Sequence, residues 1–204
     1  MNRPARRALG QALALGTLLA LAVAAHAKPA KYEIDPDHLS LGFLVHHLGY
    51  AKVLGMFRKA SGAYVFDEET GALSDVRIVI DTASVYTNHQ KRDDHLRSAD
   101  FLNAVEFPQM TFTADKAKRT AERTFVIEGR LELLGRTNPV TLEATWNKSG
   151  EYAIGSFFGG KPYVMGVSAR GSFKRSAFGM QYGLDNGWVG DEVHLIVEFE
   201  ARRQ

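Results

Sequence analysis

Apolar and polar residues alternate with a period of two in several stretches of the chain. In the first of these stretches, one set of side chains falls on a single face: Leu39, Leu41, Phe43, Val45 and His47. Alternation of this kind predicts a β-strand that turns one face toward a core. The polar His47 ends an otherwise apolar row, so we expect it at one end of the interior.

The same alternation recurs along the rest of the chain. A slip of phase between residues 53–57 and 62–66 is typical of a β-bulge, while residues 35–37 (Asp-Pro-Asp) and 116–123 are expected to form turns. The later strands are expected to turn the following residues inward: Val76, Ile78, Ile80, Met110, Phe112, Ala114, Phe125, Ile127, Gly129, Leu131, Leu133, Val140, Leu142, Ala144, Trp146, Val167, Ala169, Gly171, Phe173, Val193, Leu195, Val197 and Phe199.

About eight such strands, joined mostly by short turns, predict an all-β fold. An up-and-down antiparallel sheet of this size is wide enough to close into an eight-stranded barrel, whose interior holds either side chains or one small ligand. Because many inward positions are occupied by Gly, Ala and Val, we expect part of the interior to be unfilled.

One dense charged segment, residues 87–101, interrupts the strands. It predicts a single short helical connection, with Asn88 as the N-cap because its side-chain oxygen can accept an amide hydrogen of the first turn. A polar helix between long antiparallel runs is expected to lie near the mouth of the barrel.

The first 27 residues have the features of an export signal. Three arginines precede an uncharged apolar stretch at residues 8–25, and residues 25–27 (Ala-His-Ala) fit a small-x-small cleavage site. We expect cleavage after Ala27 and a single domain at residues 28–204. A membrane anchor is the less favoured alternative, because the apolar stretch is only marginally long enough to span a bilayer.

Composition narrows the range of functions. The expected signal contains three of the 25 basic residues and none of the 23 acidic ones, so residues 28–204 carry 22 basic and 23 acidic residues. This balance gives no electrostatic reason to expect nucleic acid as a partner. The chain has no cysteine, which excludes disulfides, thiolate metal sites and cysteine nucleophiles. No zinc, calcium or serine-nucleophile motif is present, so we assign no catalytic residue, metal or cofactor.

Two loops, residues 155–163 and 177–188, are rich in glycine and aromatic residues. Such loops suit the rim of an apolar pocket. The alternative, that their aromatic side chains pack beneath their own loops, is about equally expected.

Several sequence blocks together resemble the YceI-like family of bacterial exported proteins. They are the row from Asp35 to Gly49, Thr-Asn-His at residues 87–89, the run from Arg92 to Leu102, Phe-Pro-x-x-Thr-Phe at residues 107–112 and Thr-x-Pro-Val-Thr-Leu at residues 137–142. The resemblance covers essentially all of residues 28–204 and is weakest between residues 148 and 188. It implies a lipocalin-like antiparallel barrel in the periplasm that holds a long isoprenoid chain, such as a polyprenyl phosphate or the tail of a quinone. It implies no catalytic residue.

The inward rows supply the candidate contacts for such a tail. Each buried methylene contributes about 0.8 kcal/mol, so a polyprenyl tail needs almost no polar recognition. The candidate head-group residues, expected near the mouth, are His47, His89, Arg92 and His95. The candidate tail residues are Leu41, Phe43, Val45, Phe57, Ile78, Ile80, Phe112, Ile127, Leu142, Trp146, Phe173, Leu195 and Val197.

The leading hypothesis is therefore a non-catalytic periplasmic binding or carrier protein for an isoprenoid lipid or isoprenoid quinone, with transient contact with a membrane. Whether the protein is a monomer or a dimer is open.

The alternative is an enzyme with a metal or acid/base site at the barrel mouth. His89 and Asp93 are four residues apart, so one helix face could present both, with His95 or His47 as a third group. A short helix can also carry charged residues simply because its outer face is exposed to solvent. This interpretation is favoured for most of the charged residues of the segment.

Overall fold

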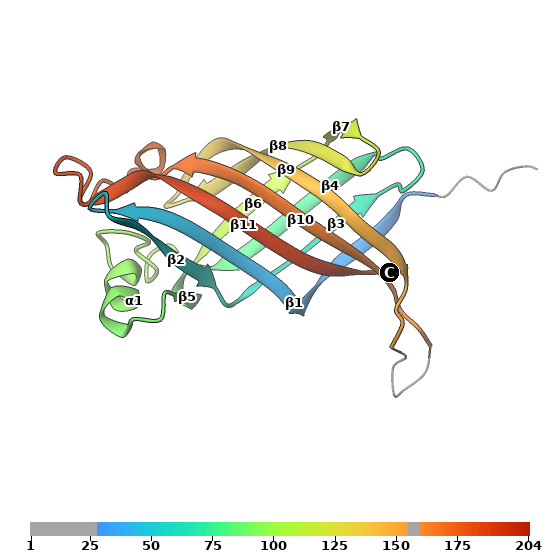
Figure 1. The fold of residues 1–204 in the computed structure, drawn as a ribbon, viewed down its shortest axis with the longest axis horizontal. Coiled ribbons are helices and arrows are strands. Elements are labelled where there is room, and N and C mark those ends of the chain that lie inside the picture. Colours follow the sequence, from blue (N-terminus) through green and yellow to red (C-terminus); the bar gives the residue numbers. More distant parts are fainter. Residues whose placement is uncertain (1–27, 155–159) are drawn as a thin grey trace, which may run out of the picture.

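The computed structural model describes residues 28–154 and 160–204. The expected export signal and the first part of the first glycine-rich loop, residues 155–159, lie outside the described residues. One antiparallel sheet curls around a long axis until its first and last strands meet (Figure 1). Its strands are β1 (Ala30–His47), β2 (Ala51–Phe57), β3 (Ala60–Phe66), β4 (Leu73–Asp81), β5 (Val85–Tyr86), β6 (Gln109–Ala114), β7 (Ala117–Ala121), β8 (Thr124–Leu133), β9 (Arg136–Glu151), β10 (Tyr163–Lys174) and β11 (Val189–Arg203).

Eight of these strands form a closed circle. The sheet order runs β11-β10-β9-β8-β6-β4-β3-β1, and β11 also pairs with β1. Every pairing in the circle is antiparallel. The prediction of an all-β, eight-stranded antiparallel barrel is confirmed.

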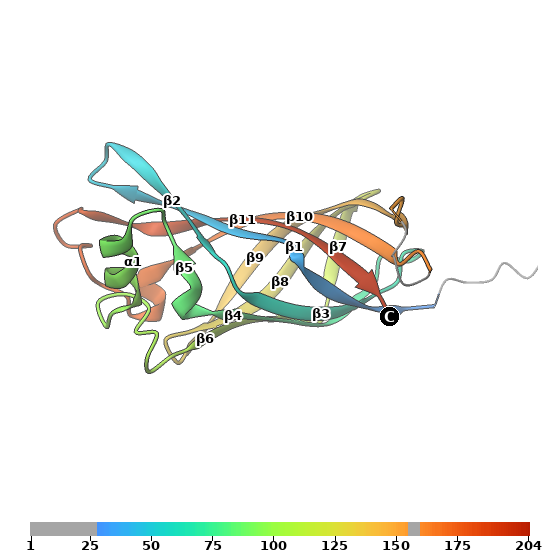
Figure 2. The ribbon, with the colours of Figure 1, turned by 90° about the horizontal axis from the view of Figure 1, so that it is seen from below.

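Three further strands, β2, β5 and β7, extend this circle. β2 pairs with the second half of β1, from Leu41 opposite Phe57 to His47 opposite Ala51, and β5 pairs with the last two residues of β2. β7 pairs only with β8. The hairpin of β1 and β2 projects at the same end of the barrel as the helix α1 (Gln90–Arg97) (Figure 2). The expected short helical connection is thus present, and the end that carries it is called the mouth.

Two expected turns are strands instead. Residues 35–37 lie inside β1, at a register irregularity between Ile34 and Leu39 where β1 pairs with β11. A proline is tolerated at such a bulge because the sheet ladder is locally interrupted there. Residues 116–123, predicted to be a solvated turn, contain β7. Its charged residues made a short edge strand resemble a turn, because edge strands commonly carry charges on their exposed positions.

A polar cluster lies at the end of the barrel opposite α1 (Figure 1). Glu68, in the turn after β3, accepts hydrogen bonds from the hydroxyls of Tyr32, Ser149 (2.6 Å) and Tyr163 (2.9 Å). Tyr32 is fully buried, and its ring stacks on Tyr64 with the ring centroids 5.4 Å apart. Burial, together with Glu68, raises the pKa of Tyr32, so its hydroxyl remains a protonated donor. The cluster ties together β1, β9, β10 and the β3–β4 turn.

We predict that Tyr32→Phe lowers the free energy of unfolding by about 1.5–3 kcal/mol, the range for hydrogen bonds to charged groups. Tyr86→Phe is the matched control, because the Tyr86 hydroxyl donates to Asn88 at the protein surface. It should change the free energy by less than about 0.5 kcal/mol. Urea denaturation of both variants measures this difference. If Tyr32→Phe and Tyr86→Phe lower the free energy of unfolding equally, the cluster does not stabilise this end of the barrel.

Candidate functional site

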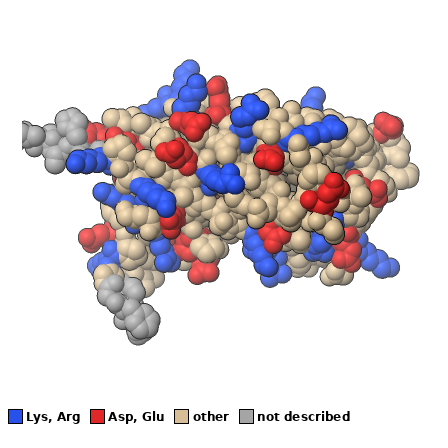
Figure 3. Space-filling model, turned by 180° about the vertical axis from the view of Figure 1, so that it is seen from behind, with Lys and Arg blue, Asp and Glu red and all other residues tan. Residues whose placement is uncertain are grey.

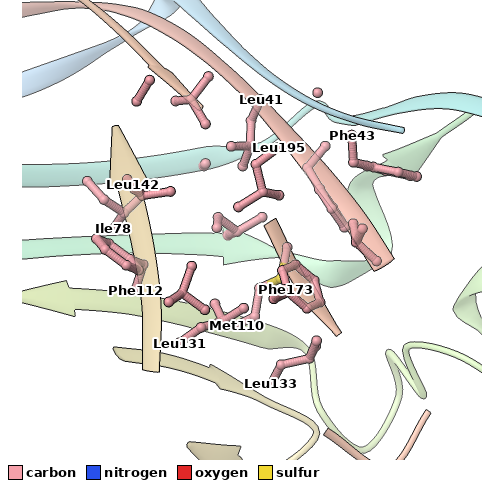
Figure 4. A pocket seen from close by; sticks show the side chains of 18 of the residues that line it. Leu41, Phe43, Ile78, Met110, Phe112, Leu131, Leu133, Leu142, Phe173 and Leu195 are labelled. Carbon is pink, nitrogen blue, oxygen red and sulfur yellow. The ribbon is translucent and has the colours of Figure 1, made fainter. Parts of the chain in front are cut away.

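The barrel encloses a cavity of about 640 Å³. This volume lies within the range of roughly 300–1,000 Å³ that is typical of small-molecule sites. Figure 4 shows the side chains of 18 of the residues that line it, and the labelled ones come from strands around the barrel. The lining is almost entirely apolar, so the interior offers apolar contact along its length and little hydrogen bonding.

All thirteen residues expected to contact a tail line this one cavity: Leu41, Phe43, Val45, Phe57, Ile78, Ile80, Phe112, Ile127, Leu142, Trp146, Phe173, Leu195 and Val197. They come together because each occupies an inward position of its strand, and a closed circle of strands directs all inward positions to one axis. The period-two pattern therefore placed these thirteen residues on the wall of the cavity.

The mouth is built from α1, the turn after β1 and the segment that leads into β11. The rings of His95 and Phe101 are 5.0 Å apart, and those of His95 and Tyr182 are 4.8 Å apart, both edge to face. Tyr182 and Trp188, from the second glycine-rich loop, line the cavity. These two residues fit the pocket rim, whereas Phe178 of the same loop is buried, packs against Phe173 and does not line the cavity, so each interpretation holds for part of the loop.

The start of α1 differs from the prediction. Asn88 is not the N-cap: its φ is 59°, in the left-handed region that Asn tolerates, and its side chain accepts a hydrogen bond from Tyr86. His89 caps the helix instead, with Nδ1 accepting a hydrogen bond from the amide of Arg92 at 3.2 Å. His89 is exposed and lies outside the cavity lining. It is the one expected head-group residue that the structure does not bring to the cavity.

Asp93 anchors the helix. Its carboxylate is buried and accepts hydrogen bonds from both the amide (2.8 Å) and the hydroxyl of Thr87. Arg92 donates to the same residue, from Nε to the Thr87 hydroxyl at 2.7 Å and from Nη2 to the Thr87 carbonyl at 2.8 Å. These bonds fix α1 beside the mouth, so Asp93 acts there as a structural group.

The other three expected head-group residues reach the cavity. His47 lies at the exposed end of β1, Arg92 is half-buried, and His95 pairs with Asp100 through Nε2 and Oδ2 at 2.8 Å. His47, Arg92 and His95 therefore place polar and basic groups at one end of an apolar chamber. This arrangement suits a ligand with one polar end.

Arg175 is a charged lining residue that the sequence interpretation missed, besides the polar His46 and Thr87. It lies in the short 3-10 helix η2 (Arg175–Phe178), is only 1% exposed, and lines the cavity. Its guanidinium donates to the carbonyls of Gly190 (2.7 Å), Met180 (3.0 Å) and Val189 (2.8 Å), and it lies over the ring of Phe101. The sequence did contain a signal for Arg175. The inward residues alternate with a period of two, and Arg175 is two residues after Phe173.

The charge of Arg175 has no carboxylate within ion-pair distance among the described residues. The charge of Asp191 acts on Arg175, but the Asp191 carboxylate accepts hydrogen bonds from the amide and the hydroxyl of Ser176. Burial lowers the pKa of Arg175, and Asp191 opposes this shift. A buried cation without a contacting anion is costly, so Arg175 adds a strong attraction for negative charge near the mouth.

Residues 28–154 and 160–204 contain no group of three or more His, Asp or Glu placed to hold a metal ion. The four residues of the enzyme alternative, His47, His89, Asp93 and His95, are not assembled into one cluster, because His89 and Asp93 serve the start of α1. Within the same ranges, no helix has the length and apolar character needed to cross a bilayer.

The surface shows no bias toward one sign of charge on the face drawn in Figure 3, where basic and acidic side chains are interspersed. The fold and the cavity together define a closed antiparallel β-barrel with an apolar interior, a class of barrel that can hold one small ligand.

Comparison with known proteins gives the family. The model of the YceI-like domain matches residues 32–201, and the chain belongs to this family. Protein YceI of Escherichia coli O157:H7 is 40% identical over 183 residues, which cover 89% of this chain and 91% of that protein. The resemblance found in the sequence is therefore confirmed.

Solved structures give the same fold. The Campylobacter jejuni YCEI protein is 28% identical, with a TM-score of 0.68, and the match covers 78% of this chain and 90% of that one. A polyisoprenoid binding domain from Saccharophagus degradans has a TM-score of 0.59 over 87% of this chain and 100% of its own. At 12% identity, this second likeness concerns the fold alone.

Proposed function

We propose that this protein is a periplasmic binding or carrier protein for an isoprenoid lipid or isoprenoid quinone, and that it is not an enzyme. The observation that carries the proposal is the single apolar cavity, which is lined by inward side chains from the whole circle of strands. A chamber of this kind suits a long hydrocarbon chain, because each buried methylene contributes about 0.8 kcal/mol without any polar recognition.

The family and the expected export signal support the same proposal. The barrel of this family is also the fold of a domain described as polyisoprenoid binding. A long isoprenoid chain does not cross water freely, and a carrier with a dry interior would shield it. The enzyme alternative is the weaker one, because two of its four residues hold the start of α1.

The polar end of the ligand is proposed to lie at the mouth, near His47, Arg92, His95 and Arg175. Two of these groups are guanidiniums, and Arg175 is buried without a contacting carboxylate. Charge-assisted hydrogen bonds to a guanidinium are about twice as strong as neutral ones. An anionic head group such as a phosphate therefore fits this end better than an uncharged quinone ring.

The rim supports transient contact with a membrane. Tyr50 is 91% exposed at the β1–β2 turn, and Val105 is 96% exposed in the segment after α1. Trp188 and Leu48, which line the cavity, are also about half exposed. Aromatic residues favour the boundary between lipid and water, so the same end that opens the cavity presents groups that can enter a lipid surface.

The first test is lipid extraction from protein expressed with its signal and purified from the periplasm. We expect mass spectrometry to find an isoprenoid chain in the wild type and none in Val197→Asp, because a carboxylate in the dry interior is costly to bury. Ile196→Asp is the matched control, since Ile196 is the neighbouring residue on β11 and does not line the cavity. Repeated absence of any long-chain lipid from folded wild-type protein would refute the proposal.

The second test separates head groups. We expect the wild type to bind a polyprenyl phosphate at least about tenfold more tightly than the polyprenol of equal length. Arg175→Gln should remove most of this preference and Arg175→Lys should keep part of it, with thermal unfolding measured to confirm that both variants fold. Equal affinity of the wild type for phosphate and alcohol would exclude an anionic head group at Arg175.

The third test concerns the rim. Combined Tyr50→Ser and Val105→Ser should slow lipid transfer from vesicles by about tenfold, because two exposed apolar groups no longer enter the bilayer. Neither residue lines the cavity, so the amount of lipid bound at equilibrium should stay the same. Ile154→Ser is the control, because Ile154 is 75% exposed in the loop between β9 and β10, at the far end. If both variants transfer lipid at the wild-type rate, exchange does not use the rim.

A further inference from the structure

Four strands carry a glycine at an inward position, yet none of these glycines lines the cavity. A larger side chain from the neighbouring strand covers each one. The covered pairs are Gly55 with Phe43, Gly62 with Ile78, Gly129 with Phe112, and Gly171 with Leu142.

The contacts are too close for any other residue to fit unchanged. A Cβ atom added at Gly55 would lie 2.2 Å from Cζ of Phe43, and one at Gly129 would lie 2.2 Å from Cζ of Phe112. Real Cβ atoms do not approach other atoms so closely. The two phenyl rings therefore occupy the space that a side chain on the facing strand would fill.

All four covering side chains are themselves lining residues. Because each lies over a glycine, it lies along the wall instead of extending across the lumen. A strand glycine of this kind allows a close approach by its neighbour. The glycines thus add width to the cavity without appearing on its surface.

The pair nearest the mouth is Gly55 and Phe43, which face each other directly across β1 and β2. It is also the simplest pair, because the three atoms nearest to an added Cβ all belong to the Phe43 ring. At the other three glycines a backbone carbonyl also lies within 2.7 Å of the added atom. Only at Gly55 would an added methyl group move a side chain alone.

We propose that the recess at Gly55 sets the width of the passage just inside the mouth and so admits a methyl-branched chain. This inference rests on the proposed function and deepens it. An isoprenoid carries a methyl branch in every unit and is wider than a straight alkyl chain. While the Phe43 ring lies along the wall, the passage accepts the wider, methyl-branched chain. When the ring is displaced into the lumen, the narrower passage favours the straight chain over the branched one.

The experiment compares Gly55→Ala with the wild type. Affinities are measured for farnesol, which is methyl-branched, and dodecanol, a straight chain with the same backbone length. We expect Gly55→Ala to lose at least about tenfold in affinity for farnesol and much less for dodecanol, because overpacking narrows the lumen. Gly166→Ala is the matched control, since the nearest atom to its added Cβ is 3.9 Å away and Gly166 lies outside the lining. It should bind both alcohols as the wild type does.

A double-mutant cycle tests the mechanism. In a Phe43→Leu background, Gly55→Ala should have less than about a twofold effect on farnesol, because the ring that it would displace is gone. Equal losses for both alcohols, or an unchanged effect in the Phe43→Leu background, would overturn the inference.

A crystal structure of unliganded Gly55→Ala gives an answer that does not depend on lipid binding. We expect the Phe43 ring to point into the lumen. If β2 moves away and the ring stays on the wall, the recess does not set the width. If the wild type binds neither alcohol, the proposed function is refuted, and the ring position still decides whether Gly55 holds the passage open.

Discussion

The pairing of β1 with β11 is the constraint on which the rest of this structure depends. It runs from Tyr32 opposite Arg203 to His47 opposite Val189, and it joins the first and last strands of the described chain. Beside it, the buried carboxylate of Asp35 accepts a hydrogen bond of 2.7 Å from Arg202. Without this seam the sheet would be an open sheet with an exposed apolar face, prone to pair with other chains at its edges. Closure turns that face into an interior.

A hollow interior has an energetic consequence. Protein cores are normally close-packed, and atoms that face an empty space lose the dispersion contacts that a packed core provides. Here the ladder of the closed sheet and the polar cluster around Glu68 hold the wall in place. The cavity lining is therefore free to serve a ligand, and a hydrocarbon chain inside would restore the missing contacts.

The sequence predicted the wall of the cavity far better than the structure at the mouth of the barrel. Alternation fixes which side chains face inward, so Leu41, Ile78 and Leu195 could be placed without coordinates. The start of α1 could not be placed, because Asn88 and His89 are both acceptable caps, and the left-handed backbone at Asn88 decides between them. Arg175 was missed because a cation at an inward position contradicts the apolar pattern that defines the row. Only the carbonyls of Met180, Val189 and Gly190, brought to it by the fold, explain how it is buried.

The polar cluster of Tyr32, Glu68, Ser149 and Tyr163 joins β1, β9, β10 and the β3–β4 turn at the end of the barrel opposite the mouth. In the proposed function the head group of a bound lipid lies at the mouth, so the tail enters the barrel first, and the head group is the last part to enter and the first to leave. The depth of the barrel then limits the length of chain that it can hold. A chain longer than that depth must fold back or leave its surplus beside the head group, at the rim.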